Sequence, residues 1–252
     1  MTRIDLSTRE WHSLIGPVLP HALNDKEEPH LSVVRIEPGE RVIYAIATDR
    51  YTMAAERFLL PDSARLHDVP GPVHIRSADA AVSLKLFPFS KDEDPRLRVT
   101  IDRAPVPVSV GGGQAVFSHT AMTLESDDGT RLVLHDQRDP SQDPLGTWRE
   151  KLARMWARPL ANSPTLSLSA IHLAKWGKSV RKGERLTIYS GKDGAPLLIL
   201  VEDHFAGMWV QVRYLDGPEK ILAESPWLAE LDPGAFPYYG DNGSEPDGGG
   251  ES

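Results

Sequence analysis

Hydrophobic and polar positions along the chain follow one pattern three times. In each pass a short strand is followed by an amphipathic helix and then by three strands, with a period of roughly 50 to 90 residues. Such self-similarity indicates that one structural block is repeated.

The first pass contains the most informative stretch of the chain, VIYAIATDRYTMAAERF at Val42–Phe58. Its first half is apolar on both sides of the alternation, which predicts a strand that is buried on at least one face. The side chains of Thr48 and Asp49 can bond nearby backbone groups and turn the chain into a second strand. Earlier in this pass we expect a strand, a helix that Ser7 or Thr8 caps and that Pro17 and Pro20 break, and another strand: Arg3–Leu6, Thr8–Leu19 and Leu31–Ile36.

The second pass predicts a strand over Val73–Arg76, with Ser77 as the cap of an alanine-rich helix that reaches Leu86. Strands follow at Leu97–Ile101, Ala115–Leu124 and Arg131–Leu134. We expect 105–113 to be irregular. Gly111–Gly113 lacks the Lys-Ser/Thr pair and the helix of a phosphate-binding loop, so a flexible hairpin loop is expected there.

A helix over Thr147–Arg158, ended by Pro159, separates the second pass from the third. The third pass predicts a strand, a helix capped by Ser169 and three more strands: Thr165–Leu168, Ala170–Val180, Arg185–Tyr189, Pro196–Glu202 and Phe205–Tyr214. We therefore expect an α+β fold. Its divisions are a first domain of two blocks over 1–146, a helix and linker over 147–164, a third block over 165–215, and a C-terminal tail over 216–252 that is largely disordered after about residue 237.

Composition narrows the class of protein. The 252 residues are 40% hydrophobic and include no cysteine, and neither a signal peptide nor a membrane span is evident, so a soluble cytoplasmic protein is expected. The net charge of −8 argues against a simple electrostatic nucleic-acid binder. Five of the negative charges lie in the last part of the chain, 232–252, which has no Lys or Arg, and this leaves the body only mildly acidic: Asp232, Asp241, Glu245, Asp247 and Glu251.

No catalytic, metal or cofactor site is evident in the sequence. The nine histidines form no H-x-x-x-H or H-E-x-x-H pattern, and Glu202-Asp203-His204 is more typical of a solvated turn than of a metal site. No G-x-S-x-G motif, catalytic carboxylate pair or nucleotide fingerprint appears. We expect a protein that is not an enzyme, although an active site assembled from scattered residues stays open.

Two of the predicted helices carry a positive charge that contrasts with the acidic chain. Such a run is typical of a solvated face, but it also suits contact with DNA phosphates, which is independent of base sequence and sensitive to salt. The cations on the two helices are Arg149, Lys151, Arg154 and Arg158, then Lys175, Lys178, Arg181 and Lys182.

Two stretches resemble the bacterial sliding clamps of DNA polymerases. ATDRYTMA at Ala47–Ala54 resembles the family's A-T-D-G-[HY]-R-[LM]-A signature, with Arg50 in place of the glycine and Thr52 in place of the arginine. PLLILVEDHFAGMWVQVR at Pro196–Arg213 resembles the final strands of the family, with Gln211 in place of a proline.

The resemblance implies a ring of strand-helix-three-strand blocks, with sheets outside and helices inside, that encircles double-stranded DNA independently of its sequence. A DNA polymerase and a clamp loader would be the partners, no cofactor would be needed, and the chain would form a homo-oligomer. Twelve blocks make the family's ring, so three blocks per chain imply a tetramer, or a trimer if a further block lies between Pro140 and Asn162. The alternative is a clamp-derived interaction scaffold or transcription accessory that does not encircle DNA, because Thr8–Leu23 offers only Arg9 and two histidines to any DNA.

The resemblance also implies a groove that receives a short hydrophobic peptide of the polymerase. Carried over residue by residue, its lining is Thr48, Tyr51, Thr52, Met53, Pro159, Met208 and Val210. Methionine can repack around varied apolar anchors, and tyrosine combines an apolar ring with a polar tip. A groove requires Met53 and Met208 to be partly exposed, whereas complete burial would make them ordinary core residues.

Overall fold

The computed structural model describes residues 1–25, 27–110, 113–137, 143–156, 168–190 and 196–210. All of them belong to one compact unit, Met1–Val212, whereas a second unit, Arg213–Ser252, and thus the predicted tail, lies outside the described residues. Within the described part of the chain, no helix has the length and apolar content that a membrane crossing requires.

The first block follows the predicted order of elements closely. A capping box begins its helix, since the Ser7 hydroxyl accepts from the Glu10 backbone nitrogen (3.2 Å) and the Glu10 carboxylate accepts from the Ser7 nitrogen (2.7 Å). The elements are β1 (Thr2–Ser7), α1 (Thr8–Ile15), the short 3₁₀ helix η1 (Leu19–His21), β2 (Val33–Pro38), β3 (Val42–Thr48) and β4 (Thr52–Leu59).

The second block differs from prediction in two places. Ser77 is the first helical residue rather than the cap, and Arg76 at the cap position makes no side-chain capping bond. The predicted irregular stretch is instead the extension of a long hairpin, because its two strands pair from Leu97↔Ser126 as far as Val110↔Gly113. The elements are η2 (Asp62–Ala64), β5 (Val73–Arg76), α2 (Ser77–Leu86), β6 (Arg96–Val110), β7 (Gly113–Ser126) and β8 (Arg131–His135).

The two prolines in the hairpin, Pro105 and Pro107, lie where β6 has a single neighbouring strand. Among the described residues β1 pairs with β6 only as far as Ile101, and beyond it β6 pairs with β7 alone. A proline lacks an N–H group, so it is tolerated where that side of a strand needs no hydrogen-bond partner.

The linker helix and the third block complete the described chain. The predicted strand Thr165–Leu168 lies outside the described residues except for Leu168, so this block is described from its helix onward. The elements are α3 (Trp148–Trp156), α4 (Ala170–Ser179), β9 (Leu186–Tyr189), β10 (Leu197–Val201) and β11 (Phe205–Trp209).

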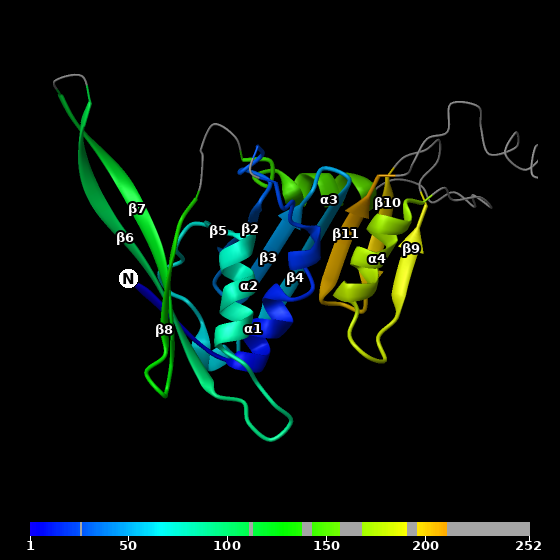
Figure 1. Cartoon of the computed structure of the whole chain (residues 1–252), viewed down its shortest axis with the longest axis horizontal. Coiled ribbons are helices and arrows are strands. Elements are labelled where there is room, and N and C mark those ends of the chain that lie inside the picture. The colour runs from blue at the N-terminus through cyan, green and yellow to red at the C-terminus, as the bar shows by residue number, and fades with distance from the viewer. Residues whose placement is uncertain (26, 111–112, 138–142, 157–167, 191–195, 211–252) are drawn as a thin grey trace, which may run out of the picture. The chain divides into compact units, whose positions relative to one another are not determined.

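Two antiparallel sheets hold these elements together (Figure 1). The smaller has the strand order β1-β6-β7-β8, and the larger has the order β5-β2-β3-β4-β11-β10-β9. The first two blocks exchange their first strands, since β1 pairs with β6 and β5 pairs with β2. Pairing of β11 with β4 then extends the larger sheet into the third block. The predicted α+β class is confirmed.

Side chains pack against both faces of the seven-stranded sheet, although α3 covers only part of one of them. The apolar pattern predicted burial on at least one face. Along β4, Ala54 belongs to the main core, while its neighbours Met53 and Ala55 point the other way and pack in a second cluster with Trp148 of α3. The main core includes one buried residue or more from each of the other helices: Trp11 of α1, Ala80 of α2 and Trp176 of α4. We call these two sides the helix face, covered by α1, α2 and α4, and the α3 face (Figure 1).

Candidate functional site

The turn between β3 and β4 is built around the buried carboxylate of Asp49, which is 3% exposed. One carboxylate oxygen accepts from the backbone nitrogens of Tyr51 (3.0 Å) and Thr52 (2.6 Å) and from the Thr52 hydroxyl (2.9 Å). Arg50 has a φ of 76°, the left-handed conformation that glycine adopts most readily. The turn thus keeps a glycine-like backbone although arginine stands at that position.

The same carboxylate fastens α4 to the first block. Burial alone would raise the pKa of Asp49, but the Lys175 ammonium and the hydrogen bonds from Thr52 outweigh it and hold this pKa below its ordinary value. Beside this pair, the ring of His21 hydrogen bonds with the hydroxyls of Thr52 (2.9 Å) and Ser179 (3.0 Å). Burial, and after it the charge of Lys175, lowers the pKa of His21 to about 3, so its imidazole is neutral.

The two stretches that carry the family resemblance lie side by side in the larger sheet. Met208 of β11 stands opposite Met53 of β4, and the Val210 nitrogen donates to the Tyr51 carbonyl at 2.8 Å. The approach of α4 to these strands depends on Gly207, because a Cβ atom there would lie 2.4 Å from the ring of Trp176. Residues about 150 positions apart in sequence are therefore neighbours, as a groove built from both motifs requires.

The seven residues of the predicted groove are not equally accessible. Tyr51 (58% exposed) and Val210 (37% exposed) are on the surface, and Met208 is half-buried. The expectation that Met53 is partly exposed is wrong, because Met53 is 2% exposed and packs with Leu145 and Trp148.

Two more members of that set serve the turn itself. Thr52 is 0% exposed and bonds to Asp49, while the Thr48 hydroxyl donates to the Thr52 carbonyl at 2.8 Å. Neither side chain can line a surface groove in this conformation, because both are turned inward. Pro159 lies outside the described residues.

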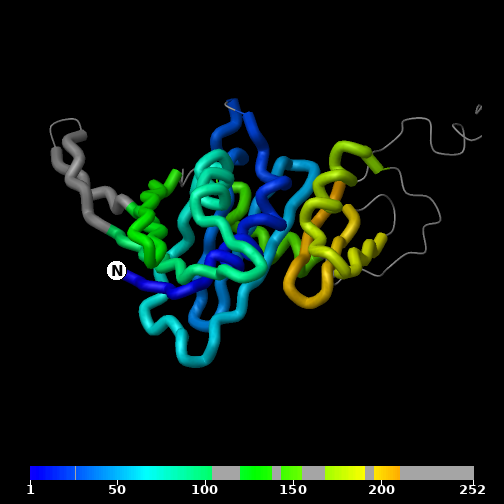
Figure 2. The backbone as a smooth tube through the Cα atoms, turned by 60° about the horizontal axis from the view of Figure 1, so that its bottom comes forward, coloured from blue at the N-terminus to red at the C-terminus, as the bar shows by residue number. Residues whose placement is uncertain are grey.

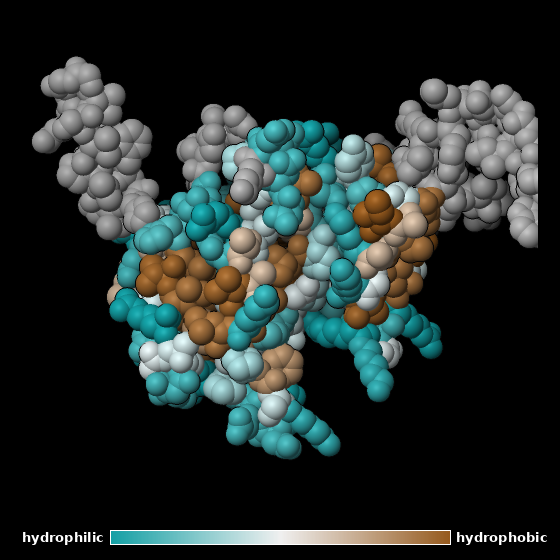
Figure 3. All heavy atoms as spheres, in the orientation of Figure 1, coloured by the Kyte–Doolittle hydropathy of each residue, from teal (hydrophilic) through white to brown (hydrophobic). Residues whose placement is uncertain are grey.

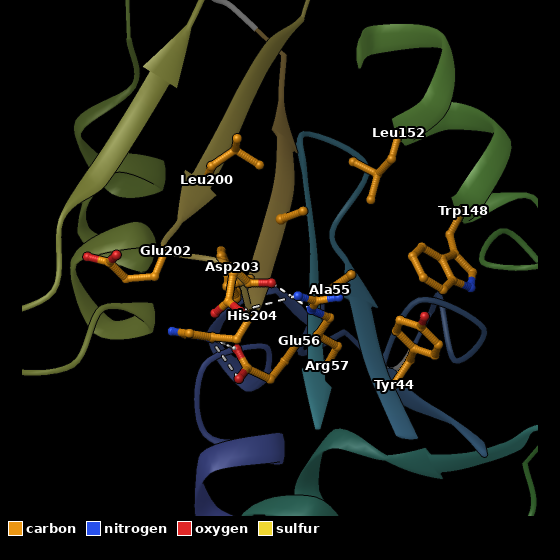
Figure 4. A pocket seen from close by; sticks show the side chains of 12 residues that line it. Tyr44, Ala55, Glu56, Arg57, Trp148, Leu152, Leu200, Glu202, Asp203 and His204 are labelled. Atoms are coloured by element: carbon orange, nitrogen blue, oxygen red, sulfur yellow. Dashed lines mark hydrogen bonds and ion pairs between the residues drawn. The ribbon is translucent and has the colours of Figure 1, made fainter. Parts of the chain in front are cut away.

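An open cavity of about 440 Å³ lies on the α3 face, next to the half-buried Met208. One part is apolar, and Figure 4 shows Trp148 and Leu152 of α3 on one side of it and Leu200 of β10 on the other. Tyr44 packs against Trp148 with ring centroids 5.2 Å apart, which gives this wall a rigid aromatic surface. Such a concave apolar lining can hold an aliphatic or aromatic anchor.

Charged side chains occupy the other end of the cavity (Figure 4). Glu56 is 2% exposed, and burial raises its pKa to about 7 although His204 and Arg181 act in the opposite direction. His204 bridges two carboxylates, Glu56 (2.9 Å) and Glu184 (3.0 Å), and Arg181 also bonds to Glu56 at 2.8 Å. This cluster joins the β10–β11 turn to β4 and to the segment after α4.

The cations of α3 are on the wrong face to act together with those of α4. α3 packs on the α3 face through Trp148, whereas α4 packs on the helix face through Trp176, so the two sets cannot line one surface. Arg149 pairs with Glu37 and lies over the ring of Trp148 at 4.3 Å. The remaining α3 cations are Lys151, which donates to the Pro144 carbonyl at 2.9 Å, Arg154, which is 3.8 Å from Glu150, and Arg158, which lies outside the described residues.

The cations in and after α4 divide into two kinds. Lys175 and Arg181 are engaged by the buried carboxylates of Asp49 and Glu56, so they are structural rather than free. Lys178 and Lys182 are exposed, and neither has an ion pair within the described ranges. Only these two of the four predicted α4 cations are available to a polyanion.

Sequence reasoning missed the residues that line the cavity. Tyr44 and Leu200 belong to strands whose both faces are apolar, and Trp148 and Leu152 stand four positions apart on one side of α3, which is the available signal. The position of α3 over the sheet is not encoded in either pattern alone. Within the described part of the chain, no group of three or more histidine, aspartate or glutamate residues is arranged to hold a metal ion.

Comparison with known proteins identifies the fold. No protein-family model matches the chain, and no curated protein sequence matches it. Among solved structures, the DNA polymerase III beta chain of Streptococcus pneumoniae is similar with a TM-score of 0.58 and 14% identity, over 85% of this chain and 65% of that chain. The putative DNA polymerase III beta subunit of Eubacterium rectale gives a TM-score of 0.57 at 11% identity, over 84% and 65% of the two chains.

The DNA polymerase sliding clamp of Bacillus subtilis is also similar, with a TM-score of 0.55 and 13% identity over 84% of this chain and 64% of that one. The chain thus spans just under two thirds of the length of these clamp chains. Over most of its own length, it has the fold of the bacterial DNA polymerase III beta sliding clamps that its two sequence motifs predicted.

Proposed function

We propose that this chain is a sliding-clamp-like processivity factor that encircles duplex DNA as a homo-oligomeric ring and tethers a DNA polymerase. The observation that carries the proposal is the placement of α1, α2 and α4 on one face of a sheet that continues from the first block into the third. A ring lined by helices needs this arrangement, because strand pairing carries the curved outer layer across block boundaries.

Four chains would supply the twelve blocks of the family's ring. The described part of 140–162 holds α3 and no strand, which favours three blocks per chain and hence four chains over three.

Contact with DNA would come from the helix face. Lys178 and Lys182 are exposed at and after the end of α4, and Lys85 is exposed on α2. These side chains would attract phosphates without reading bases, and the ring rather than tight binding would keep the protein on DNA.

Contact with the polymerase would come from the other side of the sheet. The cavity between α3 and β10–β11 is concave and apolar beside Met208, and it would take a hydrophobic anchor of a polymerase peptide. The exposed Val210 follows β11 and would extend that contact, whereas the ring of Tyr51 packs against His172 of α4 on the helix face.

The test is retention on nicked circular DNA. A ring stays on the circle at raised salt and slides off when one cut linearises the DNA, whereas an ordinary binder is indifferent to ends. Particles in negative stain should have a central hole. Solid particles, or equal retention on circular and linear DNA, would refute the proposal.

Charge reversal tests the DNA-facing surface. Lys178→Glu with Lys182→Glu should greatly reduce retention, since two exposed cations on the helix face become anions. Arg154→Glu is the matched control, because this exposed arginine lies on the α3 face. Both variants should fold normally, as exposed charges contribute little to stability.

A second candidate is a clamp-derived interaction scaffold that does not encircle DNA. It is favoured by the exposed side of α2, where Val82 and Leu86 are 49% and 41% exposed beside the single cation Lys85. Nearby Phe89 is also exposed and lies 4.9 Å from the ring of His12. An apolar surface suits a protein partner better than phosphate. If the wild-type protein bound neither circular nor linear DNA, that result would favour this role.

A further inference from the structure

Among the described residues, nothing covers the third block in the way that the first two blocks cover each other. In the first two blocks the exchanged strands β1 and β5 flank β6 and β2. Their helices also meet, since the indole of Trp11 on α1 donates to the Ser83 hydroxyl on α2 at 3.0 Å. In the third block β9 is the strand that follows the helix, as β2 and β6 do in the first two blocks. Among the described residues β9 pairs with β10 alone (Figures 1 and 2).

Equivalent positions on the three helices make this lack of cover visible. The fourth residue after the N-cap is Trp11 on α1 (1% exposed), Ala80 on α2 (0%) and Leu173 on α4 (50%). The helices are aligned correctly, because the seventh residue after the cap is buried on all three: Leu14, Ser83 and Trp176.

The strands repeat the contrast. On β2 and β6 the residues that point to the helices, Val34 and Leu97, are both 0% exposed. On β9 the corresponding Leu186 and Ile188 are only partly buried at the edge of the main core. Apolar side chains therefore gather on the outer side of α4 and β9, where Figure 3 shows hydrophobic surface.

The edge of β9 that has no partner strand among the described residues is suited to pairing with another strand. Its four residues, Leu186–Tyr189, include no proline and no charged residue, which are the usual devices that protect an edge. By contrast, β1 at the edge of the smaller sheet carries Arg3 and Asp5.

We propose that a second copy of this chain covers this surface, so that two third blocks form one complete two-block domain. The first two blocks exchange strands reciprocally, and when both partners are identical such a relation becomes a two-fold symmetric interface. The contact consists of Leu173, Leu186 and Ile188 with the edge of β9. This dimer is inferred from the fold and does not depend on the proposed ring. Only the total of four chains rests on the proposed ring, which would then consist of two such dimers.

The experiment compares two glutamate substitutions on α4 in the full chain, by light scattering after gel filtration and by sedimentation. Leu173→Glu should halve the mass of the wild-type oligomer and weaken its association about 30-fold or more, as loss of a central apolar contact does. Ile171→Glu is the matched control. Ile171 is 75% exposed, and its counterparts on the other helices, Arg9 and Ala78, face solvent within a completed domain.

A cross-link supplies a second readout that does not depend on the glutamate variant folding well. The chain has no cysteine, so Leu173→Cys carries a single thiol. A short bismaleimide should join two chains through Leu173→Cys in high yield, and through Ile171→Cys in low yield.

Failure of this interface is distinguishable from failure of the clamp. Any one of three results would overturn the interface. The wild type could be a monomer at about 50 µM, a typical concentration for such measurements. Leu173→Glu could have the same mass as the wild type, or cross-linking could be equal at positions 173 and 171. If the mass of Leu173→Glu is unchanged or the cross-linking is equal, but wild-type protein is still retained on circular DNA, then the ring exists and is closed by other contacts between its chains. Halved mass without retention of the wild type supports the interface and overturns the clamp.

Discussion

Replacing Gly207 by alanine tests how the third block is attached to the first. A Cβ atom at Gly207 would lie 2.4 Å and 2.5 Å from two ring carbons of Trp176 and 2.7 Å from the Met53 carbonyl oxygen. The indole cannot withdraw easily, because it is 1% exposed and packs against His21 (centroids 4.2 Å) and Trp209 (6.1 Å). The carbonyl belongs to the paired strand β4.

Overpacking of this kind costs about 1–3 kcal/mol. The smaller conformational entropy of unfolded alanine opposes this cost by about 0.4–1 kcal/mol. We expect a net loss of about 1–2 kcal/mol in the free energy of unfolding of Gly207→Ala, and a melting temperature lower by about 2–8 °C.

The control is Gly177→Ala, the same substitution on α4. A Cβ at Gly177 meets nothing within 4 Å, and alanine is favoured over glycine in a helix by about 1 kcal/mol, so this variant should be more stable than the wild type. Urea unfolding followed by circular dichroism measures both. If Gly207→Ala unfolds at the same or a higher urea concentration than the wild type, Trp176 does not lie over β11, and the close packing of α4 on this strand is wrong.

Three further predictions follow from buried groups. Lys175→Glu should destabilise the protein by about 3 kcal/mol or more in urea unfolding, because it removes the partner of the buried Asp49 carboxylate. Lys178→Glu should change stability by less than about 0.5 kcal/mol. Equal effects of the two substitutions would contradict a structural role of Lys175. Met53→Asp should unfold the protein, since it places a charge in the core, while Leu152→Glu should leave it folded and abolish binding of a hydrophobic polymerase peptide in a fluorescence titration. The pKa of Glu56 is raised to about 7 in the fold from 4.5, so folding takes up a proton in this range and stability falls as pH rises from 4.5 to 7. Glu56→Gln should remove this fall of up to about 3 kcal/mol, as measured by urea unfolding at pH 5, 6 and 7.5; an unchanged pH profile would show that the carboxylate is ionised throughout.

Local pattern was sufficient for most of the fold. Val73–Arg76 was predicted with its observed bounds, and the β3–β4 turn and the turn at Glu202-Asp203-His204 form where predicted. The first helix is capped by Ser7, one of the two caps that were predicted for it. In each case the signal is a change of hydrophobic period or a side chain that bonds to backbone a few residues away. Such signals depend only on neighbours in sequence, which is why one chain sufficed to find them.

The errors concern partners that are distant in sequence. Lys175 has the spacing of a solvated cation on α4, and its buried partner Asp49 is 126 positions away. Thr52 and Met53 alternate as strand residues should, but pattern does not tell which side of a two-sided strand stays open. The stretch 105–113 was predicted to be irregular because the sequence does not reveal that β6 pairs there with β7 alone.

The two-sided burial of the larger sheet has a functional consequence. If only the helix face were covered, the opposite face of the sheet would be exposed to solvent. Instead, α3 covers part of that opposite face and forms one wall of the cavity. The proposed DNA surface and the proposed partner site therefore lie on opposite sides of a rigid layer and share no exposed side chain. Arg149 stays on the partner side because Glu37 and the rings of Tyr44 and Trp148 hold it there. Substitutions on α3 should accordingly alter polymerase tethering without changing retention on circular DNA, and substitutions at Lys178 and Lys182 should do the reverse.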